Sequence, residues 1–167
     1  MTLQRFNSSA PQYHKEELFK CCGCNAWVEE LSSQFPFSSV EDLKSKSDKI
    51  WFSLDEKDWL EAFKHHPQIG DVKSLEKKFV STKEWASNEQ SGVNTATQNV
   101  LRELKELNDA YEKKFGYIFI VCATGKSAEE MLAILKSRLE NSPEEEIKIA
   151  MQEQNKITHL RIDKLFS

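Results

Sequence analysis

The sequence predicts an all-α fold: a single compact multi-helix domain with a short buried extended segment near residues 117–123. Gly and Pro are scarce, at 5 and 4 of 167 residues, which disfavours a turn-dense β-sandwich and a Gly-rich nucleotide-binding fold. Apolar residues recur at steps of three and four along most of the chain, and Ser-x-x-Glu capping signatures precede several of these runs. Because 39% of the residues are hydrophobic, the chain can build a packed core, and we expect one domain over residues 1–167.

Three helix patterns occupy the first part of the chain. Apolar residues at helical spacing predict a helix over residues 15–35, which ends at the proline that follows. A second helix begins at Ser38 or Ser39, where a capping box precedes apolar residues at helical spacing. Another box, Ser53-x-x-Glu56, predicts a helix over residues 56–65 that ends beside two adjacent histidines.

Longer helices are expected in the second part. A short charged helix is predicted around residues 73–80, and the longest regular pattern follows, from Val93 to a C-terminal Phe115-Gly116 signal. A Ser-x-x-Glu box at Ser127 begins the next helix. Pro143, in a first-turn position, begins the last helix, which runs to the C-terminus.

An unbroken apolar run from Tyr117 to Ala123 separates two of these helices. It is rich enough in β-branched residues for a buried strand, but it is too short for its periodicity to decide. Since no other segment is an obvious partner strand, we expect a buried extended segment rather than a sheet.

Charge and hydropathy exclude several classes of partner. The chain has 23 Lys plus Arg against 27 Asp plus Glu, a net charge of −4, whereas a general nucleic-acid binder normally carries a basic excess. No apolar window of about 18 residues exists, and the first residues lack the layout of a secretory signal. We therefore expect an intracellular chain with neither a nucleic acid nor a membrane as its partner.

Three further motifs are disfavoured as functional sites. Cys21 and Cys24 form a C-x-x-C without a second pair at zinc-finger spacing, so metal and redox roles are disfavoured. Gly125-Lys126-Ser127 is similar to the end of a P-loop, but position 120 is Ile where that motif needs Gly. Of the four histidines only the adjacent pair is local, and adjacent helical side chains diverge, so they do not predict a metal site.

Ordinary core packing does not explain three groups of polar residues: His65-His66 at a helix end, Glu89 with Gln90 near the start of the long helix, and Arg161 on the inward face of the last helix. Each has a structural interpretation, as a cap or a buried ion pair. The helix dipole is expected to favour a protonated histidine that titrates near neutral pH. Together these residues could relay a proton and hold an anionic, amide-rich small molecule.

Four separated blocks resemble the 2-oxo-4-hydroxy-4-carboxy-5-ureidoimidazoline (OHCU) decarboxylase family. They are residues 65–70 (HHPQIG), the Glu89-Gln90 pair, residues 114–123 (KFGYIFIVCA) and residues 153–161 (EQNKITHLR), in the family's order and across nearly the whole chain. The resemblance implies an all-α fold, usually a dimer, that acts in urate degradation without metal or cofactor. The implied reaction releases CO2 and gives (S)-allantoin.

The resemblance also implies the site. The residue before Pro67 is the catalytic histidine, which is His66 and not His65, and it would act as a proton donor or relay. Glu89 would hold ring or ureido N–H groups and orient the imidazole, and Arg161 would hold a carboxylate or carbonyl oxygen. The remaining implied substrate contacts are Pro67, Ser87, Gln90 and the backbone of Tyr117, Ile118, Phe119, Ile120 and Val121.

Two features depart from the family pattern. The family's Ser-x-x-Glu-Gln block has Ala86 at its first position here, so the hydroxyl contact to the substrate is either lost, replaced by Ser87 after a local shift, or taken over by water. Ser87 is therefore kept as a candidate site residue. Members are often peroxisomal, but residues 164–167 do not contain a peroxisomal C-terminal tripeptide, and the alternative is a cytoplasmic location. In some relatives a transthyretin-like hydroxyisourate hydrolase domain follows, which leaves open that this chain is the N-terminal part of such a bifunctional allantoin synthase.

The main alternative is a helical protein-interaction module without catalysis. In that case His66, Glu89 and Arg161 would serve as capping and ion-pair residues. The two hypotheses are separated by whether the chain speeds the appearance of optically active allantoin. If the chain is the enzyme, an acidic protein that handles an anionic substrate should concentrate positive charge locally. We expect that concentration at Arg161 and a protonatable His66.

Overall fold

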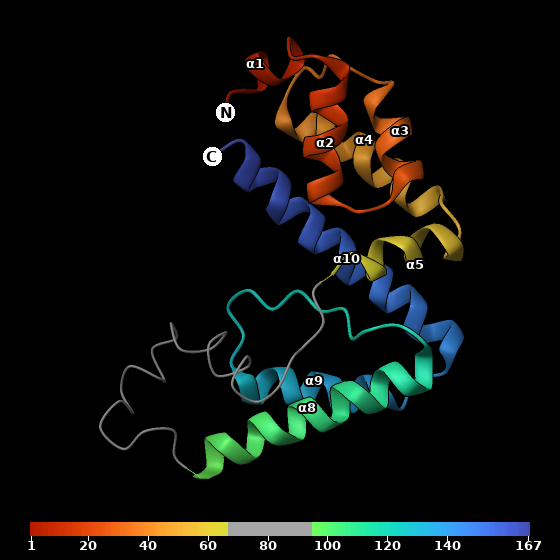
Figure 1. The fold of residues 1–167 in the computed structure, drawn as a ribbon, viewed down its shortest axis with the longest axis vertical. Helices are drawn as coiled ribbons and strands as arrows, with labels where there is room; N and C mark the ends of the chain where they lie inside the picture. Colours follow the sequence, from red (N-terminus) through yellow and green to blue (C-terminus); the bar gives the residue numbers. More distant parts are fainter. Residues whose placement is uncertain (67–94) are drawn as a thin grey trace. The chain divides into compact units, whose positions relative to one another are not determined.

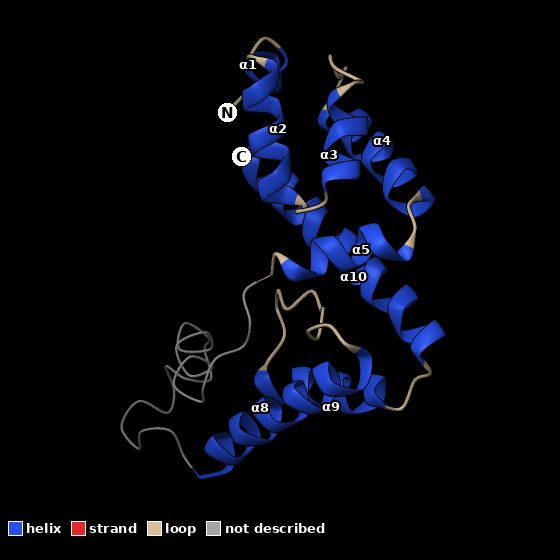
Figure 2. Cartoon of the chain, turned by 45° about the vertical axis from the view of Figure 1, so that its right-hand side comes forward, coloured by secondary structure: helices blue, strands red, loops and turns tan. Residues whose placement is uncertain are grey.

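The computed structural model describes residues 1–66 and 95–167, and these residues form eight helices and no strand (Figures 1 and 2). The prediction of an all-α fold is confirmed for this part of the chain. The helices are α1 (Leu3–Asn7), α2 (Pro11–Cys21), α3 (Asn25–Ser32), α4 (Val40–Ser53), α5 (Glu56–Lys64), α8 (Thr95–Phe115), α9 (Ala128–Leu139) and α10 (Pro143–Leu165). None of the described helices is long and apolar enough to cross a membrane.

The described residues group into two compact units. The first comprises residues 1–66, 120–122 and 147–167, and the second contains the described residues 95–119 and 123–146. The helix α10 begins in the second unit and continues in the first. One domain over residues 1–167 stays a prediction.

The helix predicted over residues 15–35 is instead two helices, α2 and α3. Between them Cys22 and Cys24 adopt extended backbone conformations. At the break Gly23 lies against His65, where an added Cβ would stand 2.7 Å from the Cβ of His65. The apolar spacing continues across the break, which is why the sequence pattern does not show it.

The next two helices begin with side-chain caps. At α4 the hydroxyl of Ser39 accepts the main-chain N–H of Asp42 at 2.9 Å, while the carboxylate of Asp42 accepts the N–H of Ser38 at 3.0 Å. The capping residue of α5 is Asp55, whose side chain accepts the N–H of Asp58 at 3.3 Å. The predicted box at Ser53 is wrong, because Ser53 is the last residue of α4.

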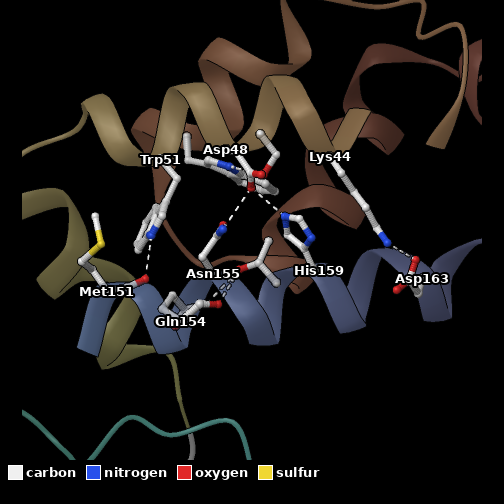
Figure 3. A network of polar contacts seen from close by, with 11 residues as sticks. Lys44, Asp48, Trp51, Met151, Gln154, Asn155, His159 and Asp163 are labelled. Atoms are coloured by element: carbon white, nitrogen blue, oxygen red, sulfur yellow. Dashed lines mark hydrogen bonds and ion pairs between the residues drawn. The ribbon is translucent and has the colours of Figure 1, made fainter. Parts of the chain in front are cut away.

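Side-chain contacts join α4 to the part of α10 that lies in the first unit (Figure 3). Asp48 accepts hydrogen bonds from Asn155 at 2.9 Å and from the ring of His159 at 2.6 Å. Lys44 and Asp163 form an ion pair further along the same two helices. Since these contacts lie on successive turns, they set the register of α10 against α4.

In the second unit α8 and α9 run side by side (Figure 1). The helix α8 closes at Gly116, which has a φ of +84° and donates its N–H to Glu112, as the C-terminal signal predicts. The hydroxyl of Ser127 caps α9 by accepting the N–H of Glu130 at 3.2 Å, as predicted. The short helix predicted around residues 73–80 lies outside the described residues.

The segment over residues 117–123 is neither helix nor strand, and Tyr117 lies in a bend. Phe119 and Ile120 are buried, whereas the residues on either side of this pair are half-buried. The prediction that this segment is not part of a sheet is therefore confirmed, and its buried part is Phe119 and Ile120.

Candidate active site

The two adjacent histidines have different surroundings. His65 is exposed, and its ring packs edge-to-face on Phe19 with the ring centroids 4.9 Å apart. His66 is half-buried at the end of α5, and its main-chain N–H donates to Phe63 at 3.2 Å. Only His66 is directed towards α10, where its ring contacts another polar side chain.

The partner of His66 is Gln154, which is fully buried on α10. The Nε2 atom of His66 and the Oε1 atom of Gln154 form a hydrogen bond. The amide nitrogen of Gln154 donates to the hydroxyl of Thr158 at 3.1 Å, and that hydroxyl donates to the main-chain carbonyl of Gln154 at 3.0 Å. The imidazole therefore ends a buried chain of hydrogen bonds that is anchored in the backbone of α10.

Burial lowers the pKa of His66 below its usual range. The positive charge of Arg161 and the neighbouring His65 act in the same direction, and the hydrogen bond to Gln154 acts against them. The helix end was expected to favour the imidazolium, but the pKa of His66 shifts in the opposite direction, because loss of hydration is the largest influence on it. His66 is thus a neutral imidazole at pH 7.

Arg161 lies on the same face of α10, seven residues after Gln154. Its side chain is half-buried, and its guanidinium donates a long hydrogen bond of 3.4 Å to the main-chain carbonyl of Cys21. It forms no carboxylate ion pair among the described residues. A guanidinium whose charge acts on a neutral imidazole is suited to holding a bound anion.

The end of the extended segment also meets this part of α10. The main-chain N–H of Cys122 donates to a carboxylate oxygen of Glu153 at 3.2 Å. Because Ile120 and Val121 immediately precede it, the peptide groups that the family resemblance assigns to the substrate belong to the same unit as His66 and Arg161.

The start of the segment belongs to the second unit. Phe119 packs edge-to-face on Tyr111, and the guanidinium of Arg138 lies 4.7 Å from its ring centroid. Tyr117 also contacts the ring of Tyr111, with the centroids 5.9 Å apart. Of the predicted backbone contacts, Tyr117, Ile118 and Phe119 are therefore in the second unit.

Four predicted site residues, Pro67, Ser87, Glu89 and Gln90, lie outside the described residues. The predicted convergence of His66, Glu89 and Arg161 stays a prediction for Glu89. For the other two, the structure places both side chains in the first unit and within range of each other's charge.

Gln154 was not among the predicted site residues. The sequence placed it on the inward face of the last helix, between apolar residues, and that was the available signal. A buried amide must find partners for its donors and its acceptor, and an ionisable partner such as His66 is one of few that a helical face can reach.

Three cysteines lie close to this region and are chemically quiet. Burial raises the pKa of Cys21 to about 11 and also raises the pKa of Cys22 well above its ordinary value. Cys24 likewise has its pKa raised by burial to about 11. Thiols with such pKa values stay protonated at neutral pH, so they are poor nucleophiles and poor metal ligands.

One group among the described residues has the ligand types and spacing of a metal site. Ligand atoms of Cys24, Asp58 and Glu61 lie within 4.8 Å of one another. Both carboxylate oxygens of Glu61 are engaged, since they accept the main-chain N–H of Asn25 at 3.1 Å and its side-chain amide at 2.7 Å. We interpret the group as the cap of α3, because Glu61 satisfies the first N–H of that helix.

Comparisons with known proteins agree with the resemblance in the sequence. Residues 7–163 match the family model described as OHCU decarboxylase. The uric acid degradation bifunctional protein TTL of Arabidopsis thaliana is 42% identical over 159 residues, which are 95% of this chain and 49% of that protein. The 2-oxo-4-hydroxy-4-carboxy-5-ureidoimidazoline decarboxylase of Xenopus laevis is 30% identical over 143 residues, 86% of this chain and 81% of that protein.

A solved structure gives the same result. A crystal structure of an OHCU decarboxylase, determined in the presence of (S)-allantoin, superposes with a TM-score of 0.73 at 37% identity, and the match covers 95% of this chain and 99% of that chain. The chain spans about half the length of the Arabidopsis relative and 28% of the bifunctional protein of Bacillus sp. (strain TB-90).

Proposed function

Since this chain belongs to the OHCU decarboxylase family, we propose that it is a carboxy-lyase that converts OHCU to (S)-allantoin in urate degradation, without metal or cofactor. The observation that carries the proposal is the position of His66. The histidine that the family resemblance assigns to catalysis is neutral, half-buried, and within the influence of an arginine without a carboxylate partner among the described residues.

The reaction breaks one bond and moves three protons. When the bond between the ring carbon and the carboxylate breaks, CO2 leaves and the electron pair passes into the ring C=N group, whose nitrogen takes up a proton from solvent. The hydroxyl on the carbon that carried the carboxylate becomes a carbonyl as it loses its proton, and the neighbouring ring carbon gains a proton on one face. A neutral imidazole suits the last two transfers, because it can accept the hydroxyl proton and deliver a proton to that carbon, and so we assign His66 the role of relay.

The other groups hold the substrate during this transfer. Arg161 would hold the anionic carboxylate or a ring oxygen with its forked donors, and Glu89 would bind ring or ureido N–H groups. Extended backbone such as Ile120 and Val121 offers donors and acceptors that a ureido group needs together. Pro67, Ser87 and Gln90, with the backbone of residues 117–119, complete the proposed contacts.

Three finer statements belong to the same proposal. We propose a homodimer, supported by the exposed apolar side chains of Phe52, which is 50% exposed, and Leu160, which is 42% exposed. We propose that the full protein carries a second domain, which the family resemblance suggests is a hydroxyisourate hydrolase; in support, bifunctional proteins of uric acid degradation are among the relatives of this chain. Such a protein would be peroxisomal if the second domain carries a peroxisomal targeting signal, and it would be cytoplasmic if it does not. Sedimentation of the purified chain and of Leu160→Glu tests the first statement.

The activity is tested by following optical activity. OHCU is made fresh from urate with urate oxidase and hydroxyisourate hydrolase, and the chain is then added while circular dichroism is recorded. We expect rapid appearance of the (S)-allantoin signal. If the trace follows only the slow spontaneous reaction to racemate, the chain is not this decarboxylase, and the alternative of a helical interaction module is favoured.

A further inference from the structure

The buried amide of Gln154 contacts the proposed catalytic histidine, and the proposed chemistry gives it no role. Its side chain is fully buried, and it stands between the ring of His66 and the hydroxyl of Thr158, itself only 2% exposed (Figure 3 labels Gln154 on α10). A helix face that packs inward normally carries an apolar residue at such a position, because an amide gains little there unless all its groups are paired.

The main-chain carbonyl of Gln154 determines which group donates and which accepts in each of these hydrogen bonds. The main-chain carbonyl of Gln154 can only accept, so the hydroxyl of Thr158 must donate its single hydrogen there. That hydroxyl can then only accept from the side chain of Gln154, which must present its NH2 group to Thr158. The amide oxygen of Gln154 therefore faces His66.

An amide oxygen has no hydrogen to give, so the ring atom that meets it must be a donor. The ring atom is Nε2 of His66, which must carry a hydrogen. In a neutral imidazole only one nitrogen is protonated, so Nδ1 is left with its lone pair.

We infer that Gln154 is a positioning residue that holds His66 as the Nε2–H tautomer, with Nδ1 as the atom that exchanges protons with the substrate. The claim that Nδ1 exchanges protons with the substrate rests on the proposed function. The claim that His66 is the Nε2–H tautomer does not. Glutamine suits this position better than a carboxylate, since it fixes the ring without adding a negative charge that would stabilise the imidazolium. The ring then stays neutral, which a relay requires before it can accept a proton.

The other charged and titratable groups near the ring do not replace this contact. Arg161 from α10 and His65 from the end of α5 act on His66 through their charge, and both disfavour its protonated form. Cys22 lies beside Thr158 and stays a thiol because burial raises its pKa, so it has a hydrogen of its own and does not compel the hydroxyl of Thr158 to turn towards it.

The tautomer is read directly from nitrogen NMR of the ¹⁵N-histidine-labelled chain, with His66 assigned by comparison with His66→Ala. We expect an Nε2 shift typical of a protonated nitrogen and an Nδ1 shift typical of an unprotonated one at pH 7.5. Predominant protonation at Nδ1 would overturn the inference, whether or not the chain has decarboxylase activity.

Two substitutions test the contact itself. Gln154→Met removes the acceptor, and we expect kcat to fall about ten- to a hundredfold, as is usual when a partner that orients an active imidazole is lost, with KM changed less than about threefold. The pKa of His66 should also fall, because the hydrogen bond raises it. Thr158→Val frees the amide to turn, so its NH2 group can face the ring, and the two nitrogen shifts should approach each other.

Matched controls separate positioning from packing. Thr158→Ser keeps the hydroxyl and should keep both the tautomer and kcat. Asn155→Ala removes a neighbouring amide of α10 that contacts Asp48, and it should lower the melting temperature without moving the nitrogen shifts of His66. If Gln154→Met and Asn155→Ala change the shifts, the pKa and kcat alike, Gln154 is a packing residue and the inference is wrong.

Discussion

Trp51 on α4 donates its indole N–H to the main-chain carbonyl of Met151 on α10 at 2.8 Å, although the two residues are 100 positions apart (Figure 3). Met151 lies one helical turn before Gln154. Because both partners of this hydrogen bond are buried, it fixes the position of α10 along α4 close to Gln154, the residue that contacts His66. The site therefore depends on a helix whose register is set by tryptophan and Asp48 contacts from α4.

Replacement of His66 should remove turnover, and replacement of His65 should not. We expect kcat to fall about 10²- to 10⁴-fold in His66→Ala, the usual contribution of a positioned proton-transfer group. His65→Ala removes an exposed ring that packs on Phe19 and lies against Gly23, and it should keep kcat within about threefold. Steady-state circular dichroism with OHCU measures both, and equal losses would contradict the assignment of His66.

Removal of the charge of Arg161 should change the pH dependence as well as binding. Arg161 lowers the pKa of His66, so Arg161→Gln should raise that pKa towards its ordinary value. A neutral His66 is needed, so kcat/KM falls as the pH drops through the pKa, and this acidic limb should move to higher pH in Arg161→Gln. A rise in KM should accompany it. An unchanged limb would show that the two groups do not interact.

The pKa of His66 is lower in the folded chain than in the unfolded chain, so protonation of His66 favours unfolding as the pH falls. The unfolded chain binds a proton at about pH 6.5, before the folded chain does. The contribution is complete above that pH, and it is lost progressively as the pH falls towards the folded pKa. Urea unfolding at a series of pH values should therefore show a fall below about pH 6.5 that is smaller in His66→Ala.

The buried ion pair between Arg138 and Glu146 should dominate the stability of the second unit. The guanidinium donates to one oxygen of Glu146 through Nε at 2.9 Å and through its terminal nitrogen at 2.5 Å, and Asn141 donates to the other oxygen at 3.0 Å. Glu146→Gln removes the carboxylate charge that the buried guanidinium of Arg138 contacts through two hydrogen bonds, which should cost about 3–5 kcal/mol. Thermal unfolding measures it, with the exposed Glu144→Gln on the same helix as the control.

A methyl group at Gly23 should disturb the end of α5. The added Cβ of Gly23→Ala would meet His65 at 2.7 Å, a distance that backbone and side chain must open. We expect a loss of about 1–3 kcal/mol and a lower kcat, because His66 follows His65 directly. The double variant Gly23→Ala with His65→Gly removes the clash and should recover most of the stability. Failure to recover would assign the cost to the backbone of Gly23.

The sequence predicted correctly several helix ends that depend on residues adjacent in the sequence. The Ser127 cap, the Gly116 terminus and the proline that begins α10 are local signals, and all three are found. The break at Gly23 could not be predicted in this way, because it accompanies a contact with His65, which is distant in the sequence.

The same limit applies to the site. The resemblance assigned His66 and Arg161 by position, and the structure adds that they share one unit and interact through charge. The neutral state of His66 and the contact with Gln154 depend on burial by α10, which periodicity alone does not quantify. Pro67, Ser87, Glu89 and Gln90 lie outside the described residues and stay predictions.

The three buried thiols between α2 and α3 supply the chain with native probes of its own opening. With pKa values raised by burial, Cys21, Cys22 and Cys24 react with a disulfide reagent only when the surrounding helices separate. The rate of colour development from Ellman's reagent would therefore report how often the first unit exposes the segment beside His65. A bound substrate analogue that closes this region would slow the reaction, so affinity could be followed without any attached label.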